Sequence, residues 1–541
     1  MLFWRSLGRP TFALRSYVHQ NQPVNVTESR GYRSKAAKGT DGALIACLFL
    51  LALFAPHSIA ATQTVWLLGM LLWVSRLLLF PAPPVYRTPL DYALLGFFIL
   101  SGISAFLSYE PFVSIGKLRA ASLFTIVYLV AQNIHSRRLV RLLVLTFVAS
   151  FMVNVLYTAA ERLVGRGVRL DVLNAESPLR ASGLNPGDTL LEIDGQEIRN
   201  PEDLWTRLSS PEKQTSTIKA YRFESFPTLT VERGVFLEGN TAQQQLGIDE
   251  WSRGRDWRAS GFYGHYITYA EALQLVLAIV VGLIVSLPSR RGWPAILLLL
   301  SLSGLLYALL LTVTRASWLA FLISSAAILM LSVSRRTTVI IGALAIPLVL
   351  SGLFVLQQKR NVGFFDSQDQ STTWRDTVWR EGLSLLVSSP RHLIVGVGMD
   401  SIKKRKQEWG LFDQGRLPMG HMHSNLLQFG LERGIPALVV WLILLGIYAR
   451  LLLRMNRRLS KTDQKRDVND DLNPPAFNLG PWIERGLALG AFGGLAGFFA
   501  SGLVHYNWGD SEVVMILYFI MGLILALNRL HESQSDRGSQ A

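Results

Sequence analysis

The stretch GHMHSNLLQFGLERGIPALVVWLILL brings together several side chains that could do chemistry beside a membrane. His421 and His423 stand just before a long apolar run, and Glu432 and Arg433 follow close behind them. Ionisable groups are costly in hydrocarbon, so they usually line a cavity, bind a substrate or contact a headgroup. Histidine can also accept a proton near neutral pH. We therefore expect a functional site where this apolar segment begins.

Three more polar patches stand beside apolar runs. Arg258 and His265 lie in RASGFYGHYITYAEAL, Arg315 lies in TVTRASWLA, and the third patch is WRDTVWREGLSLLVSSPRHLIVGVGMD at 374–400. Taken alone, each patch fits an interfacial role, because arginine snorkels to headgroups and tryptophan favours the membrane surface. One outer cavity explains all four patches together if they face the same side of the membrane.

The elements that position these residues are predicted to be membrane spans. The chain is 50% hydrophobic and 17% charged, and its apolar residues are gathered in runs close to the ~20 residues that cross hydrocarbon. We predict a polytopic α-helical membrane protein with about 12 transmembrane helices. The predicted spans are 43–60, 62–80, 89–108, 119–134, 139–160, 266–287, 294–313, 316–333, 337–356, 435–453, 484–504 and 511–528.

The basic residues predict the orientation of these spans. They are concentrated in the N-terminal tail and in alternate connections such as HSRRLVR and SRRG, which the positive-inside rule places in the cytoplasm. Both termini are then cytoplasmic, and the long insertions at 161–265 and 357–423 lie on the outer side. This topology accounts for the formal net charge of +15, so we expect the lipid bilayer and no nucleic acid as a partner. The single cysteine, Cys47, lies in an apolar run, so no disulfide framework is expected.

These boundaries divide the chain into membrane and soluble regions. The predicted regions are a basic cytoplasmic tail at 1–42, transmembrane helices 1 to 5 at 43–160, an outer soluble domain at 165–245, transmembrane helices 6 to 9 at 258–356, a large outer loop at 357–424, transmembrane helices 10 to 12 at 425–530 and a second cytoplasmic tail at 531–541.

The first insertion has the pattern of a small α/β domain. Asn200 and Pro201 can start a helix in NPEDLWTRL, and TIKAYRF and TLTVERG are typical of paired strands. The run SPLRASGLNPGDTLLEIDGQEI resembles PDZ domains of bacterial envelope proteins, which bind extended peptides along a sheet edge. In that family a carboxylate-binding loop precedes the strand that corresponds to GVRLDVL, but here only ERLVGR stands there. A peptide or protein partner and a structural spacer therefore remain alternative roles.

The order of the motifs across the membrane region resembles the O-antigen ligase and O-antigen polymerase superfamily of bacterial envelopes. The similar segments are 258–265, 314–320, 396–398 and 421–434, followed by the C-terminal run HYNWGDSEVVMILYFIMGLILAL. Each motif is weak alone, whereas their order and spacing together are specific. The PDZ-like insert is a departure, because most members have a short connection there.

The resemblance implies a glycosyltransferase in the bacterial inner membrane with its PDZ-like domain in the periplasm. The implied donor is a glycan on undecaprenyl diphosphate, and the implied acceptor is a hydroxyl of a glycan, of lipid A-core or of a protein. His423 occupies the family's matching position, where it would polarise or deprotonate that hydroxyl. Arg315, with Arg258, would hold the diphosphate leaving group, because a guanidinium binds phosphate through two parallel hydrogen bonds.

The remaining candidate residues are assigned supporting and binding roles. His421, His265, Lys117 and Arg119 are predicted to bind the lipid diphosphate or the glycan. Glu432 comes nine residues after His423, about two and a half helical turns, so we expect it to support the helix. No cofactor and no metal ion are expected, because HExxH motifs and cysteine pairs are missing from the sequence.

Four other classes of protein compete with a ligase. A polymerase for O-antigen or exopolysaccharide would use the same donor and the same residues. A non-enzymatic scaffold that only anchors the PDZ-like domain would not need the histidines of the second insertion. A transporter or an intramembrane protease is less well supported, because paired broken helices and a zinc-binding helix motif are missing from the sequence.

Overall fold

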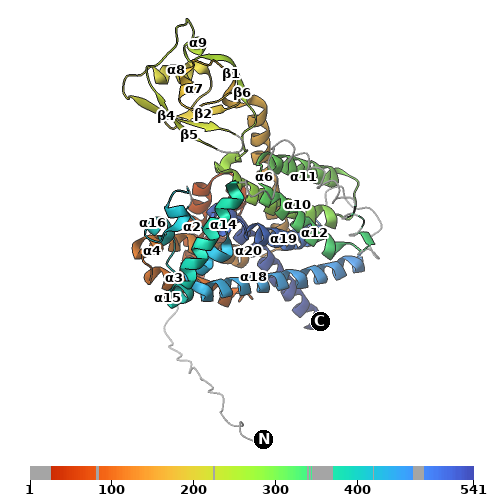
Figure 1. Ribbon diagram of the computed structural model, residues 1–541. Coiled ribbons are helices and arrows are strands. Elements are labelled where there is room, and N and C mark those ends of the chain that lie inside the picture. Colours follow the sequence, from red (N-terminus) through yellow and green to blue (C-terminus); the bar gives the residue numbers. More distant parts are fainter. Residues whose placement is uncertain are drawn as a thin grey trace.

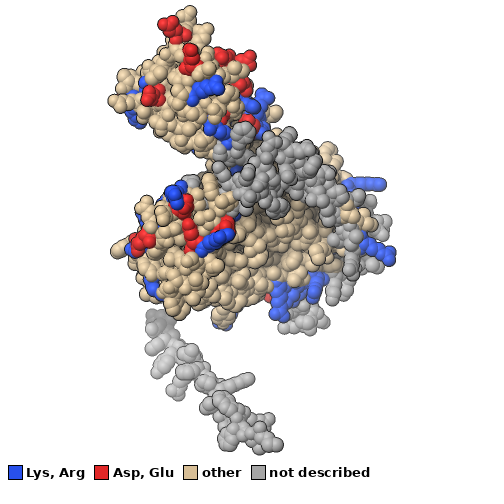
Figure 2. All heavy atoms as spheres, in the orientation of Figure 1, with Lys and Arg blue, Asp and Glu red and all other residues tan. Residues whose placement is uncertain are grey.

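The computed structural model describes residues 26–80, 85–222, 226–334, 370–417, 420–466 and 480–540, with positions 336, 337, 340 and 343. A bundle of helices carries a small sheet domain at one end, and the C-terminus lies at the other (Figure 1). On the face seen in Figure 2, much of the described surface of the bundle is free of charged side chains, as expected for a surface that contacts lipid.

Nine helical segments of the described residues are long and apolar enough to cross a membrane. This agrees with the prediction of a polytopic helical membrane protein. The segments lie in α1 (Val26–Phe54), α2 (Ile59–Leu79), α4 with α5 (Pro111–Ala121 and Thr125–Asn133), α6 (Arg137–Val164), α10 (Tyr266–Ser286), α11 (Trp293–Leu311), α12 (Arg315–Ser332), α18 (Asn425–Arg466) and α20 (Ser511–Gln540).

Other predicted spans differ from these nine in length, composition or position. α3 (Asp91–Phe106) is apolar but shorter. α19 (Trp482–Ser501) overlaps the predicted span at 484–504 but is rich in glycine and does not belong to the nine. The predicted span at 337–356 lies almost entirely outside the described residues. The exact number of spans therefore stays a prediction.

Two helices begin earlier than the predicted spans. α1 begins at Val26, within the segment 1–42 that is predicted to be a cytoplasmic tail. The fourth apolar segment begins at Pro111 rather than at 119, because Pro111 occupies the first helical turn, where its missing N–H costs nothing. Lys117 and Arg119, which are predicted to lie at the outer end of this span, therefore lie within α4.

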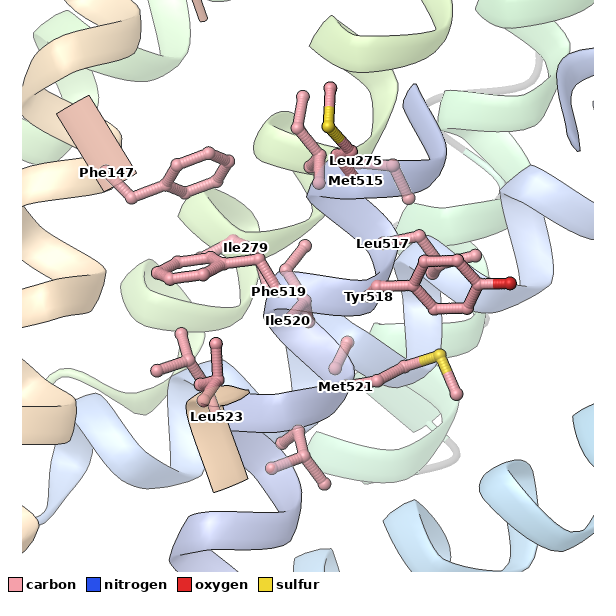
Figure 3. Packing of buried hydrophobic residues seen from close by; sticks show 14 of the residues in the cluster. Phe147, Leu275, Ile279, Met515, Leu517, Tyr518, Phe519, Ile520, Met521 and Leu523 are labelled. Atoms are coloured by element: carbon pink, nitrogen blue, oxygen red, sulfur yellow. The ribbon is translucent and has the colours of Figure 1, made fainter. Parts of the chain in front are cut away.

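Small residues let the central helices approach closely. α10 packs against α19, and a Cβ atom at Gly490 of α19 would lie 2.5 Å from Cα of Ile279. Small residues at such contacts are typical of membrane helices, where association depends on close packing. Figure 3 shows Ile279 beside Phe519 of α20, with Phe147 of α6 next to them. The rings of Phe147 and Phe519 have centroids 5.8 Å apart.

At the end of the bundle away from the sheet domain, a buried carboxylate joins three helices, α19, α6 and α20. Glu484, at the start of α19, is fully buried and binds Arg137 and Arg141 of α6. His531 of α20 lies 3.3 Å from the same carboxylate. α6 runs from this cluster to the sheet domain, so its two ends mark the two ends of the bundle.

The first insertion forms a six-stranded antiparallel sheet with three short helices. The sheet order is β5-β4-β2-β1-β6, and β3 pairs with β2. The predicted helix after Asn200 is present as α8, whose first turn is capped by the Asn200 side chain, and the predicted strand pair is β4 with β5. The elements are β1 (Arg166–Leu173), α7 (Pro178–Ala181), β2 (Thr189–Ile193), β3 (Gln196–Glu197), α8 (Pro201–Leu208), β4 (Thr215–Tyr221), β5 (Thr228–Glu232), α9 (Ala242–Gln245) and β6 (Ile248–Gly254).

The strand β6 lies beyond the predicted domain boundary at 245 and occupies one edge of β1. It pairs with β1 along its length, from Leu173 opposite Ile248 to Arg166 opposite Gly254. β1 has β2 on its other side, so neither of its edges is open. A peptide that added to β1 would first have to displace β6. The chain itself therefore fills the place that the PDZ resemblance assigns to a peptide.

We predict that β6 is held by its apolar contacts with the sheet. Ile248 is 2% exposed in the domain core, whereas Val172 of the neighbouring strand is 43% exposed. Ile248→Ala should lower the free energy of opening the sheet by about 2–5 kcal/mol, and Val172→Ala should change it by less than about 0.5 kcal/mol. Hydrogen exchange of the strand amides in the full chain measures both values. Equal effects of the two substitutions would contradict this role of β6.

Candidate functional site

Four chain segments that are far apart in sequence meet at the end of the bundle that carries the sheet domain. The N–H of Ala259 donates to Leu311 O at the end of α11, at 2.9 Å. The N–H of Asn425, which begins α18, donates to Gly502 O after α19, at 2.7 Å. The first bond joins the patch at 258–265 to the end of α11, and the second joins the start of α18 to the segment after α19.

Arg258 binds the turn that leads into α12. Its guanidinium donates to Thr312 O at 2.9 Å and to Val313 O at 2.7 Å, and it lies 3.5 Å from the centre of the Tyr266 ring. Arg315 is the first residue of α12 and is partly exposed. Arg258 therefore fixes the backbone two residues before Arg315, and the structure brings these two predicted arginines to neighbouring positions.

Hydrogen bonds of Met422 hold the turn that carries His421 and His423. Met422 is buried, its carbonyl accepts from the indole N–H of Trp379 in α14 (Gln370–Val387) at 2.8 Å, and its N–H donates to Gln428 at 2.7 Å. The two histidines flank this anchor, and their ring centroids are 4.1 Å apart. A single buried methionine thus sets the position of both predicted histidines.

A cluster of four histidines forms around this turn. Burial, together with the charges of His421 and His505, lowers the pKa of His423 to about 2, and burial and the charge of Lys403 lower that of His421 to about 4. The charges of His265 and His505 contribute to both shifts. We call His265, His421, His423 and His505 the histidine cluster.

His265 is linked to a carboxylate through a hydroxyl group. Its Nδ1 lies 3.4 Å from Thr268 Oγ1, which donates to Asp510 Oδ2 at 2.9 Å. Burial raises the pKa of Asp510 to about 7, although the hydrogen bond from Thr268 acts in the opposite direction. Burial also lowers the pKa of His265, and the charge of Arg258 adds to this effect. His265, His421 and His423 are therefore uncharged at neutral pH.

A break in α18 holds the second insertion against the bundle. Gly434 has φ of +81°, and Pro436 has no N–H for the carbonyl of Glu432, four residues earlier. That carbonyl accepts instead from Gly398 N at 2.9 Å and from Ser104 Oγ at 2.7 Å. The interruption therefore creates an acceptor that the insertion uses.

The same break explains the position of Glu432 and the glycines of the 396–398 motif. The Glu432 carboxylate accepts from Asp400 N at 2.8 Å and lies 3.3 Å from Arg433. A Cβ atom at Gly396 would lie 2.4 Å from the Glu432 carbonyl, so only glycine permits this approach. These contacts place Glu432 beneath the insertion as a structural support.

Lys117 joins the insertion through Asp400. Its ammonium group lies 2.7 Å from one carboxylate oxygen of Asp400, and Lys403 lies 3.2 Å from the other. Burial alone would raise the pKa of Asp400, but the two lysines outweigh it and hold the pKa below its usual value. Lys403 in turn acts on His421, so this pair adjoins the histidine cluster. Arg119 is exposed on α4, and the structure does not bring it to this group.

The metal-binding potential and one cavity of the described part of the chain can be compared with the histidine cluster. Among the described residues, no group of three or more His, Cys, Asp or Glu side chains is arranged to hold a metal ion. A cavity of about 290 Å³ lies elsewhere, between the end of α6 and the sheet domain, where Glu161, Glu197 and Arg166 are among its lining residues. Its lining carries charges of both signs and contains no histidine.

Sequence reasoning missed several residues of the site. Glu271, His505, Asp510 and Lys403 all contact or influence the histidine cluster. Glu271 is a single carboxylate inside an apolar run, and an ionisable residue in a span is itself a signal of function. Its partner His505 is 234 residues away, so no local spacing could have identified it.

The arrangement defines a polytopic helical membrane protein with an arginine and histidine site at one end. Within that class, the sequence model of the family described as O-antigen ligase matches residues 300–442. The matched segment contains Arg315, His421, His423 and Glu432, and it supports the resemblance to the O-antigen ligase superfamily. It does not include Arg258, which the structure places beside the start of α12. No match to a curated protein was found.

We predict that stability falls on acidification because the buried histidines resist protonation. The pKa values of His421 and His423 are about 4 and about 2 in the folded chain, against 6.5 ordinarily, so the unfolded chain binds more protons below about pH 6.5. The apparent Tm in detergent should therefore fall between about pH 7 and about pH 4. The double variant His421→Asn, His423→Asn should lose less over the same interval.

Asp510 supplies a control, because its protonation should change the stability of the folded chain in the opposite direction to that of the histidines. Its pKa is raised to about 7 from 3.8, so its protonation stabilises the folded chain as pH falls through that interval. Asp510→Asn should make the acid loss steeper. A shallower loss in this variant, or an unchanged loss in the histidine variant, would contradict the assignment.

Proposed function

We propose that the protein transfers a glycan from undecaprenyl diphosphate to an acceptor hydroxyl, in the manner of O-antigen ligases. The observation that carries this proposal is the junction of two parts of the site. Arg315, His421 and His423 belong to the family-matched segment, whereas Arg258 and His265 lie outside it, and the structure unites both groups at one end of the bundle.

The arginines and lysines suit the diphosphate of the donor. In the transfer, the acceptor oxygen bonds to the anomeric carbon while the bond to the diphosphate oxygen breaks, so negative charge grows on the leaving group. Preplaced cations stabilise that charge more than they stabilise the bound donor. In this proposal Arg315 and Arg258 take this role, and Lys117 with Lys403 supply further positive charge near His421.

The histidine cluster suits the acceptor hydroxyl. His423 contacts the acceptor in this proposal, and uncharged imidazoles can accept its proton or donate hydrogen bonds to the sugar. The site then lies on the periplasmic side of the inner membrane, with both termini in the cytoplasm. This sidedness follows the basic connections of the sequence and the shared position of the two insertions.

The sheet domain serves as an anchor in this proposal. β6 ends at Gly254, and Arg258 follows four residues later, so the pairing of β6 with β1 fixes the chain that delivers Arg258. Arg162 of α6 strengthens the junction by donating to Trp257 O at 2.9 Å. A scaffold that displays the domain for peptides would need an open β1 edge instead.

A polymerase is the second candidate, and chain length separates the two. Cells that lack the protein should accumulate lipid-linked glycan, of full length if the protein is a ligase and of single repeats if it is a polymerase. We predict that wild type restores the acceptor-bound product and that His423→Ala, at matched membrane levels, lowers it by about 10²–10⁴-fold. A normal glycan profile with His423→Ala would favour the scaffold.

We also predict that Arg315 cannot be replaced by lysine. Lysine keeps the charge but loses the planar fork that binds two phosphate oxygens. Arg315→Lys should lower kcat/KM for the donor at least about 10-fold, which corresponds to one charged hydrogen bond of ~1.4 kcal/mol or more. Arg290→Lys, an exposed position between α10 and α11, is the matched control and should keep full activity. Equal activity of both variants would remove Arg315 from the site.

A further inference from the structure

The cavity between the end of α6 and the sheet domain has no part in the roles assigned so far. Its volume of about 290 Å³ is near the lower limit for ligand pockets in proteins. A Cβ atom at Gly165, directly after α6, would lie 2.6 Å from Cβ of Arg253, so β6 passes against the end of the helix here. The cavity therefore lies at the junction of a membrane-span candidate and a soluble domain (Figure 1).

The charge pattern of α6 places this junction at the depth of the lipid headgroups. Residues 142–160 of α6 are all uncharged, and a helix of that length spans about 28 Å. This length is close to the ~30 Å of hydrocarbon in a bilayer. Glu161, which lines the cavity, is the first charged residue after that stretch. Tyr157 lines it as well, and tyrosine favours the membrane interface.

The cavity opens toward the side of α6 that contacts lipid. Val153, Leu156 and Leu163 are exposed and recur at helical spacing, so they share one face of the helix. Val164 is also exposed and belongs to the cavity lining. Acyl chains that pack along this face would therefore bring their headgroup to the cavity.

Inside the cavity, two carboxylates share one guanidinium group. Arg166 lies 3.1 Å from Glu197 and 3.9 Å from Glu161, whose side chain is only 18% exposed. A carboxylate with little access to water is costly unless its charge is balanced. A second cation beside Glu161 and Glu197 would complete that balance.

The more exposed part of the lining carries positive charge. Arg199 lies 3.8 Å from Glu197, and its side chain is 72% exposed, so this ion pair is weak. Arg253 is exposed on β6, and the ion pairs within the described part of the chain do not involve it. Both guanidinium groups are available to an anion at the mouth of the cavity.

We propose that the cavity binds the headgroup of a phospholipid with a primary ammonium group, for which phosphatidylethanolamine is the probe. The ammonium group donates to Glu161 and Glu197, and the phosphate accepts from Arg199 and Arg253. The acyl chains lie along the exposed apolar face of α6. The lipid then joins the sheet domain to the membrane surface. The inference does not rest on the proposed function, because it uses no residue of the histidine cluster.

The test compares three lipids with identical acyl chains on the purified full chain in detergent. Native mass spectrometry measures the affinity for phosphatidylethanolamine, phosphatidylcholine and phosphatidylglycerol. The choline group is a cation without an N–H donor, and the glycerol group has no cation. Phosphatidylethanolamine should bind at least about 10-fold more tightly than either of the others, the factor expected for one charged hydrogen bond.

Two substitutions separate the ammonium contact from the phosphate contact. Glu161→Gln should lower the affinity for phosphatidylethanolamine about 10-fold and change the other two affinities less than about twofold, because only one headgroup has an ammonium donor. Arg253→Gln should weaken all three lipids by a similar factor, because they share the phosphate. If Glu161→Gln does not fold, Glu197→Gln should show the same selective loss.

Glu176→Gln and Arg180→Gln are matched controls, because both residues are exposed in the sheet domain and lie outside the cavity lining. Both variants should bind the three lipids as wild type does. Equal affinities of wild type for the three lipids would overturn the proposal. A preference for phosphatidylglycerol would also overturn it, because positive charge alone would then explain binding. A preference for phosphatidylethanolamine that survives in both Glu161→Gln and Glu197→Gln would place the lipid at another site.

Discussion

The break in α18 is the constraint on which the site depends. Pro436 removes one backbone donor from the helix, and Gly434 turns the chain, so the carbonyls of Leu431 and Glu432 face the neighbouring segment. Val397 and Gly398 donate to them at 2.8 Å and 2.9 Å. A buried carbonyl without a partner is costly, so the helix and the insertion stabilise each other. The lysine pair around Asp400 and the turn of His421 and His423 both depend on this contact.

A second constraint is the satisfaction of polar groups inside an apolar bundle. Glu271 draws donors from α12, from the end of α19 and from the segment after it, and Asn425 binds Asn507 at 2.7 Å. Each of these bonds fixes the end of one helix relative to another. The polar network therefore fixes the helices relative to one another at this end of the bundle. Apolar packing around Phe519 holds them together in the middle of the bundle (Figure 3).

The sequence predicted the helical class and, in the first insertion, the helix after Asn200 and the strand pair β4 and β5, because these depend on periodicity and turn residues. The helix after Asn200 is an example, because the Asn200 side chain accepts from the N–H of Asp203, only three residues further along the chain. Partners that are distant in sequence were not predictable. Pro436 shows that the Glu432 carbonyl loses its helical donor, but nothing local shows that Gly398 replaces it. β6 was missed because IDEWSRG has charged residues at its exposed positions and only Ile248 and Gly254 buried.

The placement of β6 also bears on why a soluble domain is inserted at this point of the chain. Arg258 acts on the α11–α12 turn through two backbone carbonyls, so its effect on Arg315 depends on how firmly its own backbone is held. A flexible connection after α6 would leave that backbone free to move. Pairing β6 with β1 ties it to a folded core, and Arg162 binds Trp257 from the bundle side. The backbone that leads to Arg258 is therefore held from both sides, by the sheet and by α6.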